Sequence, residues 1–100
     1  MTKNQKELLA HLGNGYHMET VDFEDCICRT IGDRSIEISG TATRHRPYNV
    51  YVWEVLAPGK YGQIVEKYFD IKTDAELYAR LNEIESRLTG SLPQQNRLRL

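Results

Sequence analysis

Cys26 and Cys28 are the two residues in this sequence whose type and spacing come closest to a chemical site. In a β-strand, side chains two positions apart lie on one face, roughly 6–7 Å apart, so both thiols would point the same way. His17 or His45 could join them around a metal ion. Structural zinc sites, however, usually space their cysteines two to four residues apart and add a second ligand pair. The chain has no second pair, so we predict no metal site and interpret both cysteines as small packed side chains.

Catalytic motifs are also missing from the sequence. The three histidines lie in different segments, and none has a sequence neighbour that would act as a nucleophile or as an orienting carboxylate. The sequence contains no Gly-x-Ser-x-Gly, no phosphate-cradling glycine loop and no His-Glu-x-x-His. Too little of a catalytic site is present to support an enzyme, and we predict a non-catalytic protein without a cofactor.

Basic and aromatic residues that alternate over positions 44–53 form the first candidate contact surface. Arginine and tyrosine are favoured anchors at protein interfaces. Pro47 has no backbone N–H to donate to a strand, so we expect the residues around it to form a loop. The candidate partner-binding residues of this loop are Arg44, His45, Arg46 and Tyr48.

A run of acidic residues forms the second candidate surface. Its members are Glu19, Asp22, Glu24 and Asp25. Such a surface could meet a basic groove of a partner, as a nucleic-acid mimic would. The simpler interpretation is an edge strand that its charges keep from aggregating, and both interpretations stay open at this point.

Two helices are expected among the elements that must position these residues. A narrow apolar stripe predicts a short N-terminal helix over 4–12, with Asn4 as its N-cap. A capping box at Thr73-Asp74-Ala75-Glu76 and the long apolar stripe behind it predict a second helix from Thr73 to about Thr89.

Four segments between the helices have strand chemistry, namely 16–31, 35–43, 50–56 and 61–71. In the first segment the apolar residues share one parity until Asp25 interrupts them. We favour one long strand with a bulge near Glu24 and Asp25, and a turn over 23–26 between two shorter strands is the alternative. The second segment alternates most regularly, with apolar side chains inward and polar ones outward.

One face of the strand 50–56 must meet the C-terminal helix. The strand carries Val50, Val52 and Glu54 on one side and Tyr51, Trp53 and Val55 on the other. The second side is larger and has no charge, and aromatic residues dominate core burial, so we predict that this side is buried. Tyr51 and Trp53 would then build the core and would not form a stacking surface for bases.

Together these elements predict one α+β domain over 1–90. We expect an antiparallel sheet of three to four strands, with the C-terminal helix packed on one face, the short N-terminal helix beside it, and a polar, flexible tail over 91–100. A chain of 100 residues can bury one modest core. No apolar run resembles a signal peptide or reaches the length of a membrane span, and two cysteines are too few for a disulfide scaffold. We therefore expect a cytoplasmic protein without membrane contact.

The charge of the chain argues against a nucleic-acid binder, because 13 basic and 14 acidic residues give a net charge of −1 and neither half is basic. The order helix, strands, helix, with Leu8-Leu9 before a strand entered at Tyr16, resembles that of a double-stranded RNA-binding domain. That family grips phosphates with a lysine pair at the start of its last helix. Here Lys72 is followed by Asp74 and Glu76, which would repel phosphates, so the resemblance covers element order alone and implies RNA binding for no residue.

The function predicted from the sequence is that of a small non-catalytic protein-binding module, such as an inhibitor or regulator. In size, near-neutral charge and lack of catalytic motifs the chain is similar to the small accessory proteins of phages and mobile elements. The alternative is a nucleic-acid-associated protein that uses the Arg44–Arg46 loop with Arg97 and Arg99. A sheet with only one helix-covered face would also leave room for a homodimer.

Overall fold

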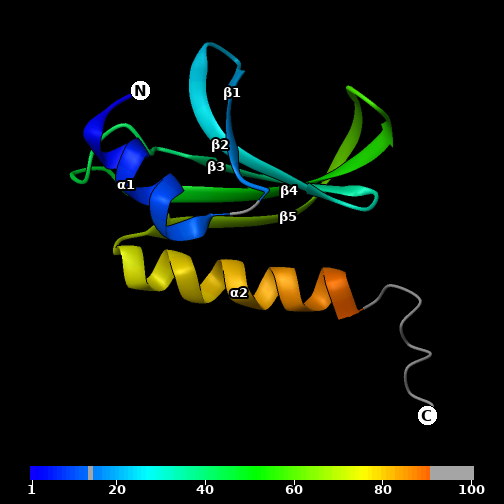
Figure 1. Cartoon of the computed structure of the whole chain (residues 1–100). Helices are drawn as coiled ribbons and strands as arrows, with labels where there is room; N and C mark the ends of the chain where they lie inside the picture. Colours follow the sequence, from blue (N-terminus) through cyan, green and yellow to red (C-terminus); the bar gives the residue numbers. More distant parts are fainter. Residues whose placement is uncertain (14, 91–100) are drawn as a thin grey trace.

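The computed structural model describes residues 1–13 and 15–90 and shows two helices and five strands (Figure 1). In chain order the elements are α1 (Lys3–Leu12), β1 (His17–Val21), β2 (Glu24–Ile31), β3 (Arg34–Ser39), β4 (Tyr48–Ala57), β5 (Lys60–Ile71) and α2 (Asp74–Gly90). The strands form one antiparallel sheet in the order of the chain. The predicted α+β class is confirmed, but the predicted count of three to four strands is wrong. The predicted tail, 91–100, lies outside the described residues.

The additional strand comes from the segment 16–31, which forms a hairpin and not the one bulged strand that we predicted. β1 pairs with β2 along its whole length. Asp22 and Phe23 connect the two strands with φ angles of 50° and 69°, the left-handed conformation that both central residues of a type I′ hairpin turn adopt. The sequence hides this turn because its usual signature is Asn-Gly or Asp-Gly, whereas a phenylalanine takes the second position here.

The face of β4 that meets the helices carries valines and not aromatic rings. Val50 and Val52 are fully buried. They pair with Ile38 and Ile36 of β3, and residues that pair directly share a face of the sheet. Since β3 presents isoleucines to the helices, β4 must add its valines to the same side. The structure thus contradicts the prediction for the three residues assigned to the core, Tyr51, Trp53 and Val55.

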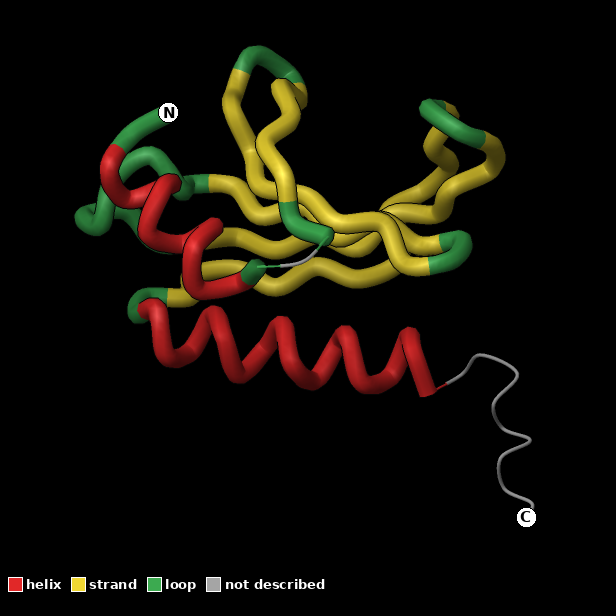
Figure 2. Tube along the Cα trace, in the orientation of Figure 1, coloured by secondary structure: helices red, strands yellow, loops and turns green. Residues whose placement is uncertain are grey.

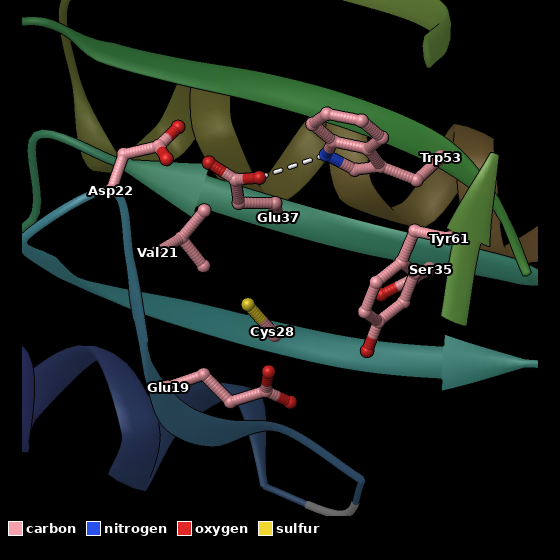
Figure 3. Close-up of a pocket in the computed structure, with 8 residues that line it drawn as sticks. All are labelled: Glu19, Val21, Asp22, Cys28, Ser35, Glu37, Trp53 and Tyr61. Atoms are coloured by element: carbon pink, nitrogen blue, oxygen red, sulfur yellow. Dashed lines mark hydrogen bonds between the residues drawn. The ribbon is translucent and has the colours of Figure 1, made fainter. Parts of the chain in front are cut away.

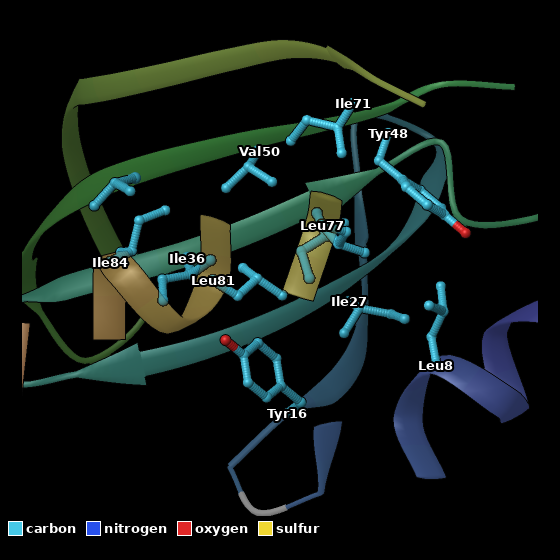
Figure 4. Packing of buried hydrophobic residues seen from close by; sticks show 12 residues of the cluster. Leu8, Tyr16, Ile27, Ile36, Tyr48, Val50, Ile71, Leu77, Leu81 and Ile84 are labelled. Atoms are coloured by element: carbon cyan, nitrogen blue, oxygen red, sulfur yellow. The ribbon is translucent and has the colours of Figure 1, made fainter. Parts of the chain in front are cut away.

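α2 lies along this apolar face of the sheet and supplies the other side of the core (Figures 1 and 4). Leu77, Leu81 and Ile84 are fully buried, as their spacing predicts. The predicted capping box is confirmed: Thr73 Oγ1 accepts from the Glu76 amide at 3.1 Å, and the Glu76 carboxylate accepts from the Thr73 amide at 3.1 Å. Within the described residues, neither helix combines the length and the apolarity that crossing a membrane requires.

α1 packs its single apolar stripe into the same core and begins one residue earlier than predicted. Its N-cap is Thr2, which forms a capping box with Gln5, so the prediction of Asn4 as the cap is wrong. Asn4 is buried, and its side-chain amide donates to the Thr41 carbonyl at 2.8 Å and to the Tyr48 hydroxyl at 3.3 Å. The first turn of α1 is therefore tied by polar contacts to Thr41, which follows β3, and to Tyr48, the first residue of β4.

The sheet is strongly curved. Figure 2 shows that the tips of the β1–β2 hairpin and of the β4–β5 hairpin both bend to the side away from α2. The pairing of β4 with β5 contains several register shifts between Tyr48 and Ala57, and such bulges bend a strand and increase its twist. As a result, the sheet face that points away from α2 is concave.

Candidate partner-binding site

The concave face of the sheet mixes small, acidic and aromatic side chains. Along its centre it carries Cys26 and Cys28 of β2, Ser35, Glu37 and Ser39 of β3, and Tyr51 and Trp53 of β4. The side chains from β2 and β3 are buried, and the two aromatic residues of β4 are partly exposed. A sheet face without a covering helix normally exposes polar groups to water, so the burial at its centre reflects the curvature of the sheet.

A pocket lies in this concave face, and we call it the cup pocket. Its lining residues are Glu19, Val21, Asp22, Cys28, Ser35, Glu37, Trp53 and Tyr61 (Figure 3). All five strands contribute, since the curvature brings residues of β1 and β5, the two edges of the sheet, to the same site. The volume of the pocket is about 180 Å³. A cavity of roughly 150 Å³ accepts benzene, so the cup pocket can hold the end of one large side chain.

Glu37 is the buried carboxyl of the cup pocket and is only 9% exposed. Its Oε1 accepts a hydrogen bond from Trp53 Nε1 at 2.8 Å (Figure 3). Its Oε2 lies 3.8 Å from the Cys26 thiol, which is a weak donor. Burial raises the pKa of Glu37; the hydrogen bonds from Trp53 and Cys26 oppose this rise, and the charges of Asp22 and Glu24 add to it. Of the two carboxyl oxygens, Oε2 thus accepts from a weak donor, the Cys26 thiol.

The two cysteines are buried free thiols. Burial, with a contribution from the Glu37 carboxylate, raises the pKa of Cys26 and that of Cys28 to about 12. Because the thiolate is the nucleophile and the metal ligand, thiols with such pKa values are chemically quiet near neutral pH. In the described part of the chain, no group of three or more histidine, cysteine or acidic side chains has the arrangement of a metal site. Both cysteines thus act as small neutral groups in the concave face.

The predicted acidic surface is divided between two places. Two of its members line the cup pocket, namely Glu19 and Asp22. The Glu24 carboxylate instead accepts from the Gly40 amide at 2.7 Å, and Asp25 accepts from the Thr20 hydroxyl at 2.9 Å. Of the first pair, Glu19 already contacts the His17 imidazole at 2.5 Å through Oε2. In the second pair, Glu24 supports the backbone at Gly40, and Asp25 joins the two strands of the hairpin through the side chain of Thr20.

The predicted basic contact is divided as well. Arg44 is exposed, but its guanidinium bridges the two helices through ion pairs with Glu7 of α1 and Asp74 of α2. Tyr48 is not a loop residue: it begins β4, is 2% exposed, and donates its hydroxyl to Asp74 at 2.6 Å. Tyr48 is thus a core residue, contrary to its predicted place in an exposed loop. The other members of the predicted set are exposed between β3 and β4: His45 and Arg46.

Phe23 stands at the tip of the β1–β2 hairpin, next to Asp22 of the cup pocket. Among the large hydrophobic side chains that the structure describes, it is the most exposed, at 104%. Its left-handed backbone costs a non-glycine residue about 1–2 kcal/mol, and an exposed ring offsets none of this by burial. Strained and exposed residues of this kind cluster at binding sites, where the partner supplies the missing contacts.

No family model, curated protein or solved structure matches this chain. The site therefore rests on its own geometry.

The sequence identified Glu19 and Asp22 but missed the central pair of the pocket, Glu37 and Trp53. It predicted Trp53 in the core and Glu37 on an ordinary polar face. The signal that could have placed Trp53 beside Glu37 is the pairing of β3 with β4. This pairing sets Ser35 opposite Trp53, so the indole lies on the same face of the sheet as Glu37.

Proposed function

We propose that this protein is a non-catalytic protein-binding module that docks its partner on the concave face of the sheet. It acts as a cytoplasmic inhibitor or regulator, in the manner of the small accessory proteins of phages and mobile elements. The observation that carries the proposal is the cup pocket, where all five strands bring acidic and aromatic side chains together on the face away from α2. Aromatic residues in partly desolvated pockets are the usual anchors of protein interfaces.

The charge of the cup pocket indicates a basic partner surface. Among the described residues that line it, Glu19, Asp22 and Glu37 are acidic and none is lysine or arginine. Interfaces match such a potential with the opposite charge, which steers association and excludes other partners. Phe23, beside this acidic rim, supplies an apolar anchor for the same partner.

The chemistry of the pocket supports binding over catalysis. Cys28 is its one described thiol, and burial with the carboxylates of Glu19 and Glu37 keeps that thiol protonated. A nucleophilic cysteine needs the reverse, an electropositive and partly exposed position that lowers its pKa. Ser35 lies among the lining residues without a histidine beside it in that set, so the nucleophile–base pair of acyl transfer is missing from the described lining.

The test is capture of a partner by the immobilised protein from a lysate of its source organism. We compare the wild type with Phe23→Gly, which removes the exposed ring, and with the Arg44→Ala/Arg46→Ala double variant, which removes the charges of the basic loop. We expect a protein that the wild type and the double variant retain and Phe23→Gly loses. With the purified pair, Phe23→Gly should weaken binding at least about tenfold, the size expected for an interface anchor.

Capture that requires Arg44 and Arg46 but not Phe23 would contradict docking on the concave face and would favour the basic loop. Circular dichroism of each variant checks that the fold is intact. A captured protein that binds all three forms equally would contradict the proposal as well.

A further inference from the structure

We propose that the cup pocket receives the guanidinium end of an arginine side chain of the protein partner. The proposal rests on the proposed function and adds to it the chemical group that enters the pocket. Three features of the pocket support it, namely its charge, its aromatic walls and the weak thiol donor at Oε2 of Glu37.

The carboxylates of the pocket favour a cationic ligand. Figure 3 shows Glu19, Asp22 and Glu37 around the side chains of Val21 and Cys28, with the carboxylates on more than one side of the pocket. The negative charge of Asp22 disfavours the charged form of Glu37, so a cation between them removes an unfavourable interaction as well as adding favourable ones. The pocket therefore gains more from a positive group than from a neutral one.

The aromatic walls suit a planar cation. Trp53 and Tyr61 come from β4 and β5 and line the pocket together with the acids. The hydrogen bond from Trp53 Nε1 to Glu37 Oε1, 2.8 Å long, fixes the indole in place before any ligand arrives. A cation near the face of a tryptophan or tyrosine ring is attracted by the ring quadrupole, most of all when water is excluded.

Glu37 can accept a further, stronger hydrogen bond at Oε2. Oε1 is occupied by the indole N–H, but the contact of Oε2 is the Cys26 thiol at 3.8 Å. A buried carboxylate oxygen with so weak a donor gains a charge-assisted hydrogen bond when a cationic N–H reaches it. The residue is nine-tenths buried, so water competes with such a donor only weakly.

Arginine fits these features better than lysine does. Its guanidinium carries five N–H donors in a fixed plane, so it can donate to carboxylates on several strands at once while it stacks on an aromatic ring. It is also less strongly hydrated than an ammonium group, which lowers the cost of entering a pocket of about 180 Å³. The described acids do not form the arrangement of a metal site, so a side chain is the cation that we assign to the pocket.

The test uses the fluorescence of Trp53, which is the only tryptophan of the chain. The probes are Nα-acetyl-arginine amide, the corresponding lysine amide and the corresponding citrulline amide, which has nearly the shape of arginine without its charge. Titrations at constant ionic strength, set with sodium chloride, remove general screening effects. We expect a saturable change with the arginine probe, a weaker one with the lysine probe and none with the citrulline probe.

Glu37→Gln should weaken binding of the arginine probe at least about tenfold, since the charge-assisted bond is lost while the indole keeps an acceptor. Glu83→Gln on α2 removes an acid outside the pocket lining and should leave the affinity unchanged. Equal responses to arginine and citrulline, a stronger response to lysine, or equal affinities of wild type and Glu37→Gln would each overturn the proposal.

The two proposals can fail separately. If the captured protein depends on Phe23 but the arginine probe does not bind, the docking face stands and the arginine assignment falls. If the probe binds as expected but capture does not depend on Phe23, the pocket binds a cation and the proposed docking of a protein on this face falls.

Discussion

Glu37 is a carboxyl in a place that favours its neutral form. Burial raises its pKa, and the negative charges of Asp22 and Glu24 raise it further. In the range between the ordinary carboxyl pKa and the raised one, the folded protein binds more protons at this residue than the unfolded chain does. The free energy of unfolding therefore falls as the pH rises through this range, and the loss persists at neutral pH.

Glu37→Gln should for this reason raise the melting temperature at pH 7. Glutamine keeps an acceptor for the Trp53 indole but carries no charge into the buried site. The difference from the wild type should shrink as the pH falls from the raised pKa of Glu37 towards the ordinary carboxyl pKa, and it should vanish below that, where the residue is protonated in both the folded and the unfolded chain. Thermal unfolding followed by circular dichroism from acid to neutral pH measures this.

Glu83→Gln is the matched control for this prediction. Glu83 forms an exposed ion pair with Arg80, so its replacement should change the melting temperature little. A Glu37→Gln variant that melts below the wild type at pH 7 would show that the carboxylate stabilises the fold.

At the scale of elements, the β1–β2 turn is a second feature that lowers the stability of the fold, because Phe23 adopts a left-handed backbone conformation. Phe23→Gly should raise the free energy of unfolding by up to about 1 kcal/mol, because glycine adopts the left-handed conformation without strain. The variant also has Asp-Gly in the turn, a preferred type I′ pair, and removal of the exposed ring breaks no buried contact. In a domain of this size the melting temperature should rise by a few degrees.

Gly59→Ala in the β4–β5 turn is the reverse control. Gly59 has a φ of 75°, and an added Cβ would meet no atom within 4 Å, so the loss of stability there would come from the backbone alone. Opposite signs for Phe23→Gly and Gly59→Ala are expected. If Phe23→Gly destabilises the protein, the ring must stabilise the fold, and its use as a pure binding variant would have to be abandoned.

The elements that sequence reasoning placed correctly are those whose signals are local. The capping box at Thr73 lies within a single element and matches the structure. The alternation of β3 correctly turned Ile36 and Ile38 to the core, but the strand ends at Ser39, and its polar residues on the other face are buried as well. The buried side of β4 depends on which residues of β3 it pairs with, and the size of its aromatic residues pointed to the wrong side. The cup pocket depends on the curvature of the whole sheet, which no single segment encodes.

At the scale of the whole molecule, the net charge distinguishes the two functions predicted from the sequence, protein binding and nucleic-acid binding. The net charge is −1, and Arg44 of the basic loop already pairs with Glu7 and Asp74. We therefore expect the protein to pass through a heparin column at about 0.1 M salt, where proteins that contact several phosphates are held. Retention that the Arg44→Ala/Arg46→Ala double variant loses would support the nucleic-acid alternative.

The order of the strands has a consequence for how the molecule is made. Each strand pairs with its neighbour in the chain, so every pairing of the sheet closes only a short loop of chain. Proteins whose contacts are local in this sense fold faster than other β-rich proteins of equal size. The cup pocket, like the packing of the two helices, depends on parts of the chain that are far apart, because it joins Glu19 of β1 to Tyr61 of β5. Binding activity should therefore appear in the newly made chain only after every strand is in place.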